Sequence, residues 1–413
     1  MRVRLLRDHD FRGLFLADSA SQVGSQLLLL ALPLVAVSAL HASEFEVGLL
    51  AACQTLAFVV IGLPAGAIVD RLRKRAVMMV SDWARALALA SVPVAWWLDV
   101  LTIHQLYAVA LVLGVFTVFF DSAYLSYLPH LVGRERLVEG NSVLEGVRTV
   151  AQLGGPSVGG YLVQFLTAPF ALVVTVLGYA WSGLCLAGIR KREERQERRG
   201  AHLGKEIGEG VRFVLGHPLL RCIVACAATA NLFASMAQPP ILLLLARELG
   251  LAAGTIGLLL AAGGLGGMIG ALVNRRVVAR FGQGPTIWLT VGLTAPLMFL
   301  VPWVEADWRL GLFVVFELCF AAGAVVFNIT QLSFRQAITP EALLGRMNAT
   351  FRFLVWGTMP LGGLAGGALG GLIGVRNTLV VAAAGACLAF LWVFASPLRT
   401  MRELPARQAL ADR

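Results

Sequence analysis

The sequence predicts an all-α membrane protein of twelve transmembrane helices, built as two six-helix bundles, with both termini in the cytoplasm. Hydrophobic residues make up 58% of the 413 residues and charged residues only 14%, against roughly 45–50% and about 25% in soluble proteins. Apolar runs of about 20 residues recur along the whole chain, and each is long enough to cross a bilayer as a helix. Since lipid cannot hydrogen-bond to the backbone, each run is expected to be helical.

The apolar runs give the expected order of the elements. The first six spans are predicted at 12–38, 47–69, 76–98, 103–127, 141–165 and 169–189, and the second six at 219–245, 254–273, 285–303, 310–333, 347–373 and 377–396. These ranges define an N-terminal bundle (1–189), a linker (190–218), a C-terminal bundle (219–398) and a tail (399–413). The first apolar run is too long for a cleavable signal peptide and lacks a small-residue cleavage site.

The linker carries a second pattern inside its charged stretch. Leu203, Ile207, Val211 and Leu215 recur every four residues, with charged residues between them. This spacing predicts an amphipathic helix that lies on the membrane surface or against the bundle.

The basic residues predict the orientation. With the N-terminus in the cytoplasm, all 34 Lys and Arg residues except Arg247, Arg309 and Arg376 fall in cytoplasmic segments or at cytoplasmic helix ends. Positive residues in short loops face the cytoplasm, so we expect a multi-pass protein of the inner (plasma) membrane. The same distribution explains the net charge of +10 without a nucleic-acid partner.

The two halves of the chain repeat one another. Similar residues coincide at a shift of 209 positions early in each half and 207 further along, as in Arg12 with Arg221, Gly48 with Gly257, Arg71 with Arg280, Asp121 with Asn328 and Asn141 with Asn348. A parallel repeat of six helices is a transporter architecture, with the solute site near the membrane midplane between the halves.

The loop between the second and third spans carries a family resemblance. It runs from Gly62 through Gly66 to Asp70-Arg71 and ends in a basic cluster at Arg75, which resembles the signature loop of the major facilitator superfamily. The resemblance implies a cytoplasmic gate, with Asp70 as its acid, Arg71 as the partner of that acid, and Gly66 permitting close helix contact. The second half keeps Arg280 but has no acid at the equivalent position.

The fifth span contains Gly154-Gly155-Pro156-Ser-Val-Gly159-Gly160, which resembles the core of the superfamily's antiporter motif. Proline bends a helix, and glycines allow helices to approach closely.

Other segments resemble the drug:proton antiporter branch that includes macrolide-efflux and enterobactin-exporter-like proteins. They are Asp10-Phe11-Arg12, Asp82 with Arg85, and the stretch from Leu128 to Asn141. Ser25 follows Gly24 where such relatives commonly have an acid, so no proton role is carried over to that position.

Charged residues inside the predicted spans are the candidates for coupling, because burial of a charge in a membrane is costly. Among them we single out Asp18, Asp121, Glu317, Glu145 and Arg148, and Arg352 lies in the cytoplasmic part of the eleventh span. We expect one or more of Asp18, Asp121 and Glu317 to bind and release a proton as the cavity alternates. Arg148 could neutralise Asp121 or Glu145 in one conformation. Alternatively, Glu145 and Arg148, three residues apart on one helix face, form a structural pair.

These observations predict a secondary transporter that exports an amphipathic small molecule, of the drug, macrolide or siderophore class, by proton antiport. Its partners would be the substrate, protons and the lipid bilayer, and a monomer is expected. No metal-ligand spacing or nucleophile constellation is evident, so neither a metal, a cofactor nor an enzyme activity is expected. The alternatives are an uptake symporter or lipid flippase on the same fold, and a non-transporting membrane sensor or assembly partner.

Overall fold

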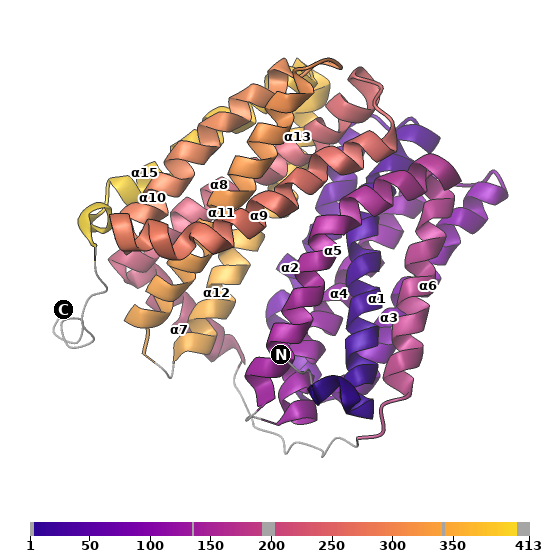
Figure 1. The fold of residues 1–413 in the computed structure, drawn as a ribbon, viewed down its shortest axis with the longest axis horizontal. Helices are drawn as coiled ribbons and strands as arrows, with labels where there is room; N and C mark the ends of the chain where they lie inside the picture. The colour runs from indigo at the N-terminus through magenta and orange to yellow at the C-terminus, as the bar shows by residue number, and fades with distance from the viewer. Residues whose placement is uncertain (1–3, 134–135, 192–202, 341–342, 403–413) are drawn as a thin grey trace. The chain divides into compact units, whose positions relative to one another are not determined.

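All regular structure in the described part of the chain is helical (Figure 1). The computed structural model describes residues 4–133, 136–191, 203–340 and 343–402. The chain divides into two compact units: unit 1 comprises Met1–Gly200 and Gly250–Ala261, and unit 2 comprises Ala201–Leu249 and Ala262–Arg413. Within the described residues, eleven helical segments are long and apolar enough to cross a membrane. The predicted span at 141–165 is not among the eleven, because polar residues and glycines dilute its apolar side chains.

The described part of unit 1 contains six long helices. They are α1 (His9–Leu34, continued by the π-helical turn Val35–Ala39), α2 (Glu44–Asp70), α3 (Lys74–Trp97), α4 (Ile103–Val132), α5 (Leu137–Leu166) and α6 (Ala168–Ala187), preceded by a short 3-10 turn at Arg4–Arg7. Asp8 caps the first turn of α1, and Ser43 with Glu46 forms a capping box at the start of α2, which satisfies backbone N–H groups that a helix start leaves free. Helix α1 packs on α5 and α6, and α3 packs on α4 and α6.

Unit 2 begins with the linker helix and ends beyond the last apolar run. Its elements are α7 (Leu203–Gly216), α8 (Pro218–Leu243, continued as Leu244–Glu248), α9 (Ala253–Phe281, whose residues up to Ala261 belong to unit 1), α10 (Gln283–Thr294, continued as the 3-10 segment Ala295–Trp303), α11 (Leu310–Ile338), α12 (Leu344–Trp356), α13 (Met359–Ile373), α14 (Val375–Leu388), α15 (Leu391–Phe394) and a 3-10 turn at Pro397–Thr400.

The predicted span at 347–373 is interrupted. Helix α12 ends at Trp356 and α13 begins at Met359, since Pro360 has no N–H to continue the hydrogen-bond ladder. Side-chain hydrogen bonds join the break to α8. The Asn231 amide of α8 donates to the Val355 carbonyl at 2.8 Å, and the Thr358 hydroxyl donates to the Ala228 carbonyl of α8 at 3.3 Å. The span at 377–396 is likewise divided, into α14 and α15.

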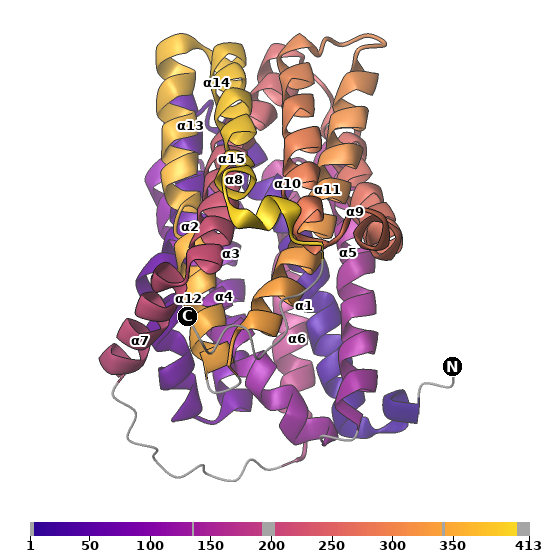
Figure 2. The ribbon, with the colours of Figure 1, turned by 90° about the vertical axis from the view of Figure 1, so that its left-hand side faces the viewer.

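The linker helix α7 lies against α12 (Figure 2). Arg346 on α12 forms an ion pair with Glu209. Gly210 lies so close to α12 that an added Cβ would overlap Thr350 Oγ1. The packed face therefore runs through Gly210 and Val214, which is 1% exposed, whereas Leu215, predicted on the apolar face, is 42% exposed. The missing side chain at Gly210 lets α7 approach on this face.

Replacing Gly366 by alanine is expected to lower the melting temperature of the purified protein by several degrees. Helix α13 packs on α8, and a Cβ at Gly366 would overlap the Met236 carbonyl oxygen and lie within 3.3 Å of Met236 Cα. Backbone atoms cannot move aside as a side chain can, and overpacking of this kind costs about 1–3 kcal/mol. The matched control is Gly371→Ala on the same helix, where no atom lies within 4 Å of the new Cβ. Equal melting temperatures for the two variants would contradict the packing described here.

Candidate functional site

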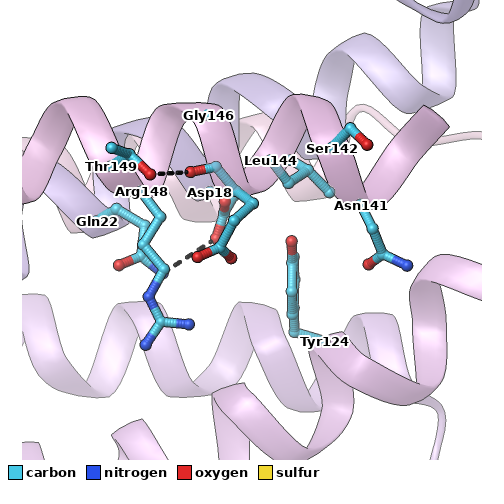
Figure 3. Close-up of a pocket in the computed structure, with 10 residues that line it drawn as sticks. Asp18, Gln22, Tyr124, Asn141, Ser142, Leu144, Gly146, Arg148 and Thr149 are labelled. Carbon is cyan, nitrogen blue, oxygen red and sulfur yellow. Dashed lines mark hydrogen bonds between the residues drawn. The ribbon is translucent and has the colours of Figure 1, made fainter. Parts of the chain in front are cut away.

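Unit 1 contains a cavity of about 570 Å³ within its own helices. It is lined by residues from α1, α4 and α5: Asp18, Gln22, Tyr124, Asn141, Ser142, Leu144, Glu145, Gly146, Arg148 and Thr149 (Figure 3). Three of the predicted coupling residues, Asp18, Glu145 and Arg148, therefore share one cavity.

Asp18 is the buried acid of this cavity. Asp18 is 3% exposed. The amide of Gln22, one helical turn further along α1, donates to Asp18 Oδ1 at 3.4 Å. The hydroxyl of Tyr124 points from α4 into the same space (Figure 3). Glu145 and Arg148 are exposed on α5, and the structure has no ion pair between them. Both residues line the cavity.

Asp121 and Glu317 lie elsewhere. Asp121 is part-buried on α4, one turn before Tyr124, and is not among the residues that line the cavity. Glu317 is part-buried on α11 of unit 2, where its Oε2 atom would lie 2.7 Å from a Cβ built on Gly263 of α9. Glu317 thus occupies space that the absence of a side chain at Gly263 leaves open.

A buried ionic network holds α1 in place beside the cavity. The Arg85 guanidinium on α3 pairs with Asp82 and donates to the Ser21 hydroxyl on α1 at 3.3 Å. Asp82 also accepts from the Ser182 hydroxyl on α6 at 2.6 Å. All four residues are buried. Ser21 lies one turn from Asp18 on α1, so this bond helps to set the rotation of α1 that turns Asp18 into the cavity.

Two aromatic rings enclose the same guanidinium. The Arg85 Cζ atom lies 4.6 Å from the ring centroid of Phe120 and 4.4 Å from that of Tyr179, distances at which a cation is attracted to a ring. The Tyr179 hydroxyl is in turn 3.1 Å from the Ser25 hydroxyl of α1. Sequence reasoning singled out Asp82 and Arg85 only through a resemblance. Their opposite charges, three residues apart inside an apolar run, were the signal for a buried pair.

The gate-like loop has a different environment from the one expected. The Arg75 side chain donates to the Leu186 carbonyl at 2.7 Å and to the Ala187 carbonyl at 2.5 Å, so it caps the end of α6, where cations are favourable. Arg71 follows α2 as an exposed residue. Among the described residues, no atom lies within 4 Å of a Cβ built on Gly66, so unit 1 itself does not make the close helix contact expected there. The side chain of Asp70 lies outside the described part.

The glycines of the α5 motif make close contacts within unit 1. A Cβ on Gly155 would overlap the Gln26 side chain of α1, and one on Gly159 would lie 3.2 Å from Leu27 Cδ2. Gly160 faces the first turns of α9, where a Cβ would lie 3.1 Å from the Gly257 Cα atom. The motif therefore lets α5, which contains Pro156, pack closely against two helices.

Unit 2 contains a second cavity, of about 350 Å³. Apolar and aromatic residues form most of its wall, together with a few polar ones: Ala227, Ala230, Asn231, Ala234, Val291, Thr294, Ala295, Phe320, Gly323, Ala324, Phe327, Asn328, Gln331, Arg335, Phe351, Arg352, Val355, Trp356 and Ala386. Arg335 was missed by sequence reasoning, which counted it among the cytoplasmic helix ends. The signal available was the repeat, since a shift of 207 residues places Arg335 on the apolar Leu128.

Comparison with known proteins decides the family. The sequence pattern of the transmembrane secretion effector family, a branch of the major facilitator superfamily, matches residues 4–411. The chain belongs to this family. Its relatives include the multidrug efflux pump Tap of Mycolicibacterium fortuitum, 29% identical over 88% of this chain and 90% of that protein. They also include the enterobactin exporter EntS of Escherichia coli O1:K1, 27% identical over 100% of this chain and 98% of that protein.

Solved structures of other transporters share the fold of this member of the secretion effector family. The nucleoside transporter NupG aligns with a TM-score of 0.76 at 13% identity, over 96% of this chain and 99% of that one. A bacterial homologue of the iron transporter ferroportin, in its inward-facing state, aligns with a TM-score of 0.75 at 16% identity, over 96% and 99% of the two chains. The family match confirms the predicted superfamily, and these likenesses confirm the all-helical fold.

Proposed function

We propose that this protein exports an amphipathic small molecule, of the drug, macrolide or siderophore class, in exchange for protons. The substrate site opens to one side of the membrane at a time, as alternating access requires. The observation that carries the proposal is the buried Asp18 carboxyl in a polar cavity of a membrane bundle. An ionisable group within a membrane helix is costly to keep and marks a substrate or proton path. Relatives named as an efflux pump and an exporter support the outward direction.

The coupling chemistry follows from the cavity residues. A carboxyl group changes its protonation when its surroundings change between water and a closed cavity, and Asp18 is the buried acid of this cavity, so opening the cavity would expose it to water. Arg148, on the same cavity wall, supplies a positive charge that can replace the proton as the partner of the carboxylate. Glu145, Asp121 and Glu317 are secondary candidates for the same role.

The finer topology is part of the proposal. Twelve spans result if α5 crosses the membrane together with the eleven apolar segments. The positive-inside rule places both termini in the cytoplasm and the protein in the inner (plasma) membrane. We propose bundles at 1–189 and 219–398, joined by the linker 190–218 and followed by a tail at 399–413, in a protein that works as a monomer. Asp70 and Arg71 would form the cytoplasmic gate.

Everted membrane vesicles test this function directly. Vesicles are acidified inside by respiration, and a pH-sensitive dye reports the proton gradient while erythromycin, ethidium or enterobactin is added. Antiport predicts that a transported compound enters the vesicle and releases protons from it, so the dye signal recovers. Vesicles without the protein are the control. Substrate entry without proton release would contradict antiport, and unchanged transport by Asp70→Asn would contradict the gate.

A further inference from the structure

The Arg335 guanidinium is buried in unit 2 without an anionic partner among the described residues. Arg335 is 4% exposed near the end of α11, and its Nε atom is buried without a hydrogen-bond acceptor. Its guanidinium carbon lies 3.3 Å from the ring centroid of Phe351, and Nη1 lies 3.9 Å from the Met347 sulfur. Neither contact neutralises the charge, and a buried charge costs several kcal/mol unless it is paired.

The rest of the cavity wall adds positive charge and no negative charge. Arg352 also lines it, with its guanidinium carbon 4.5 Å from the ring centroid of Trp356, and no Asp or Glu is among the lining residues that the structure describes. Gln331, one turn before Arg335 on α11, is 4% exposed, and its buried Oε1 atom has no hydrogen-bond donor among the described residues. Phe320, Phe327 and Trp356 provide flat apolar surfaces. Two polar side chains, each with a buried atom that has no partner among the described residues, therefore line an aromatic cavity.

The internal repeat shows that this cavity is the counterpart of the one in unit 1 with its charge reversed. The shifts of 209 and 207 residues place Asp18 on Ala227, Gln22 on Asn231, Tyr124 on Gln331, Leu144 on Phe351, Glu145 on Arg352 and Arg148 on Val355. Each of these residues lines the cavity of its own unit. The acidic positions of the first cavity are thus alanine and arginine in the second, where Arg335 adds a further cation.

We propose that the cavity of unit 2 binds an anionic group, such as a carboxylate or phenolate, on a substrate with a flat apolar body. This inference rests on the proposed function and names its substrate class. The anion would accept hydrogen bonds from the Arg335 Nε–H and from Arg352, and a hydroxyl beside it would donate to Gln331 Oε1. The apolar body would lie against Phe320, Phe327 and Trp356. The volume of about 350 Å³ is in the range of small-molecule sites.

Binding to the purified protein in micelles tests the proposal without transport. We use calorimetric titration with 2-naphthoate and its neutral isostere 2-naphthamide. Hydrogen bonds to a charged group are stronger than those to a neutral one, so naphthoate is expected to bind wild type at least about 10-fold more tightly than naphthamide. Equal affinity of the two compounds for wild type would overturn the proposal, and this comparison needs no variant.

Variants then assign the preference to the cavity. In Arg335→Gln, the advantage of naphthoate should fall severalfold, because only Arg352 is left to pair with the anion, while naphthamide affinity stays the same. Arg276→Gln, which removes an exposed charge of α9, should keep the full advantage. A folded Arg335→Gln protein that retains the full preference for naphthoate would overturn the assignment to this cavity.

Lipids provide a second test. Displacement of naphthoate by phosphatidylglycerol, but not by phosphatidylcholine, would assign the site to a lipid headgroup and would also overturn the proposal. Anion-selective binding without proton exchange in vesicles would support this inference and contradict the antiport proposal.

Discussion

Replacing Asp18 by asparagine is expected to abolish substrate-driven proton release in everted vesicles, to the level of vesicles without the protein. Asparagine has the same size and its Oδ1 still accepts from the Gln22 amide, so the fold is expected to survive. Asparagine cannot bind and release a proton, so no group is left to carry protons in exchange for the substrate. The measurement is the recovery of the pH-sensitive dye signal after substrate addition.

The matched control is Glu145→Gln in the same cavity. Glu145 is exposed on α5, so its surroundings change less between conformations, and most of the proton release should remain. A second readout separates coupling from binding: Asp18→Asn should still exchange labelled substrate for unlabelled substrate across the membrane without a gradient. Full proton release by Asp18→Asn would refute the assignment and move attention to Asp121 and Glu317.

Replacing Arg85 by methionine is expected to destabilise unit 1 by about 3–5 kcal/mol, because it leaves the buried Asp82 carboxylate without its cation. Arg85 and Asp82 are 1% and 0% exposed, so water cannot take the place of the missing partner. The rings of Phe120 and Tyr179 would also lose the cation between them. The measurement is unfolding of the purified protein in mixed micelles by heat or denaturing detergent.

The double variant Asp82→Leu/Arg85→Met provides the decisive comparison. Apolar side chains of similar volume can replace a buried ion pair at little cost, so the double variant should be more stable than Arg85→Met alone. Arg376→Met is the surface control, since Arg376 and its partners Glu248 and Glu305 are each at least one-third exposed and such pairs contribute roughly 0–1 kcal/mol. If the double variant is no more stable than Arg85→Met, then Arg85 does not stabilise unit 1 by neutralising the Asp82 carboxylate.

The positions of the helices could be predicted because the required signals are local. The length of an apolar run and the residues that cap it are properties of consecutive residues, as for α2, where Ser43 and Glu46 cap the first turn. The break between α12 and α13 was missed although Pro360 was visible. A proline can also sit within a continuous membrane helix, as Pro156 does in α5, and here the Asn231 and Thr358 side chains complete the break with α8.

The candidate site was predicted only in part. The sequence identified Asp18, Glu145 and Arg148, and the structure brings these three to one cavity. It did not separate them from Asp121 and Glu317, which line neither cavity, because the direction of a side chain around a helix axis depends on the neighbouring helices. The same reason explains why unit 1 makes no close helix contact at Gly66. A glycine permits a close contact, but the neighbouring helices decide whether a partner lies there.

By itself, the sequence determined the class of protein: the membrane spans, the repeat and the family follow from run lengths, charge positions and motifs along one chain. Only the tertiary structure decided which charges are buried and how each is paired. Arg75, Arg85 and Arg335 look alike as arginines in or beside apolar runs. Yet Arg75 caps α6, Arg85 pairs with Asp82, and Arg335 lies at an aromatic cavity without an anionic partner in the described part of the chain. The free energy of a buried charge depends on the groups within a few ångströms of it, and helices distant in sequence supply those groups.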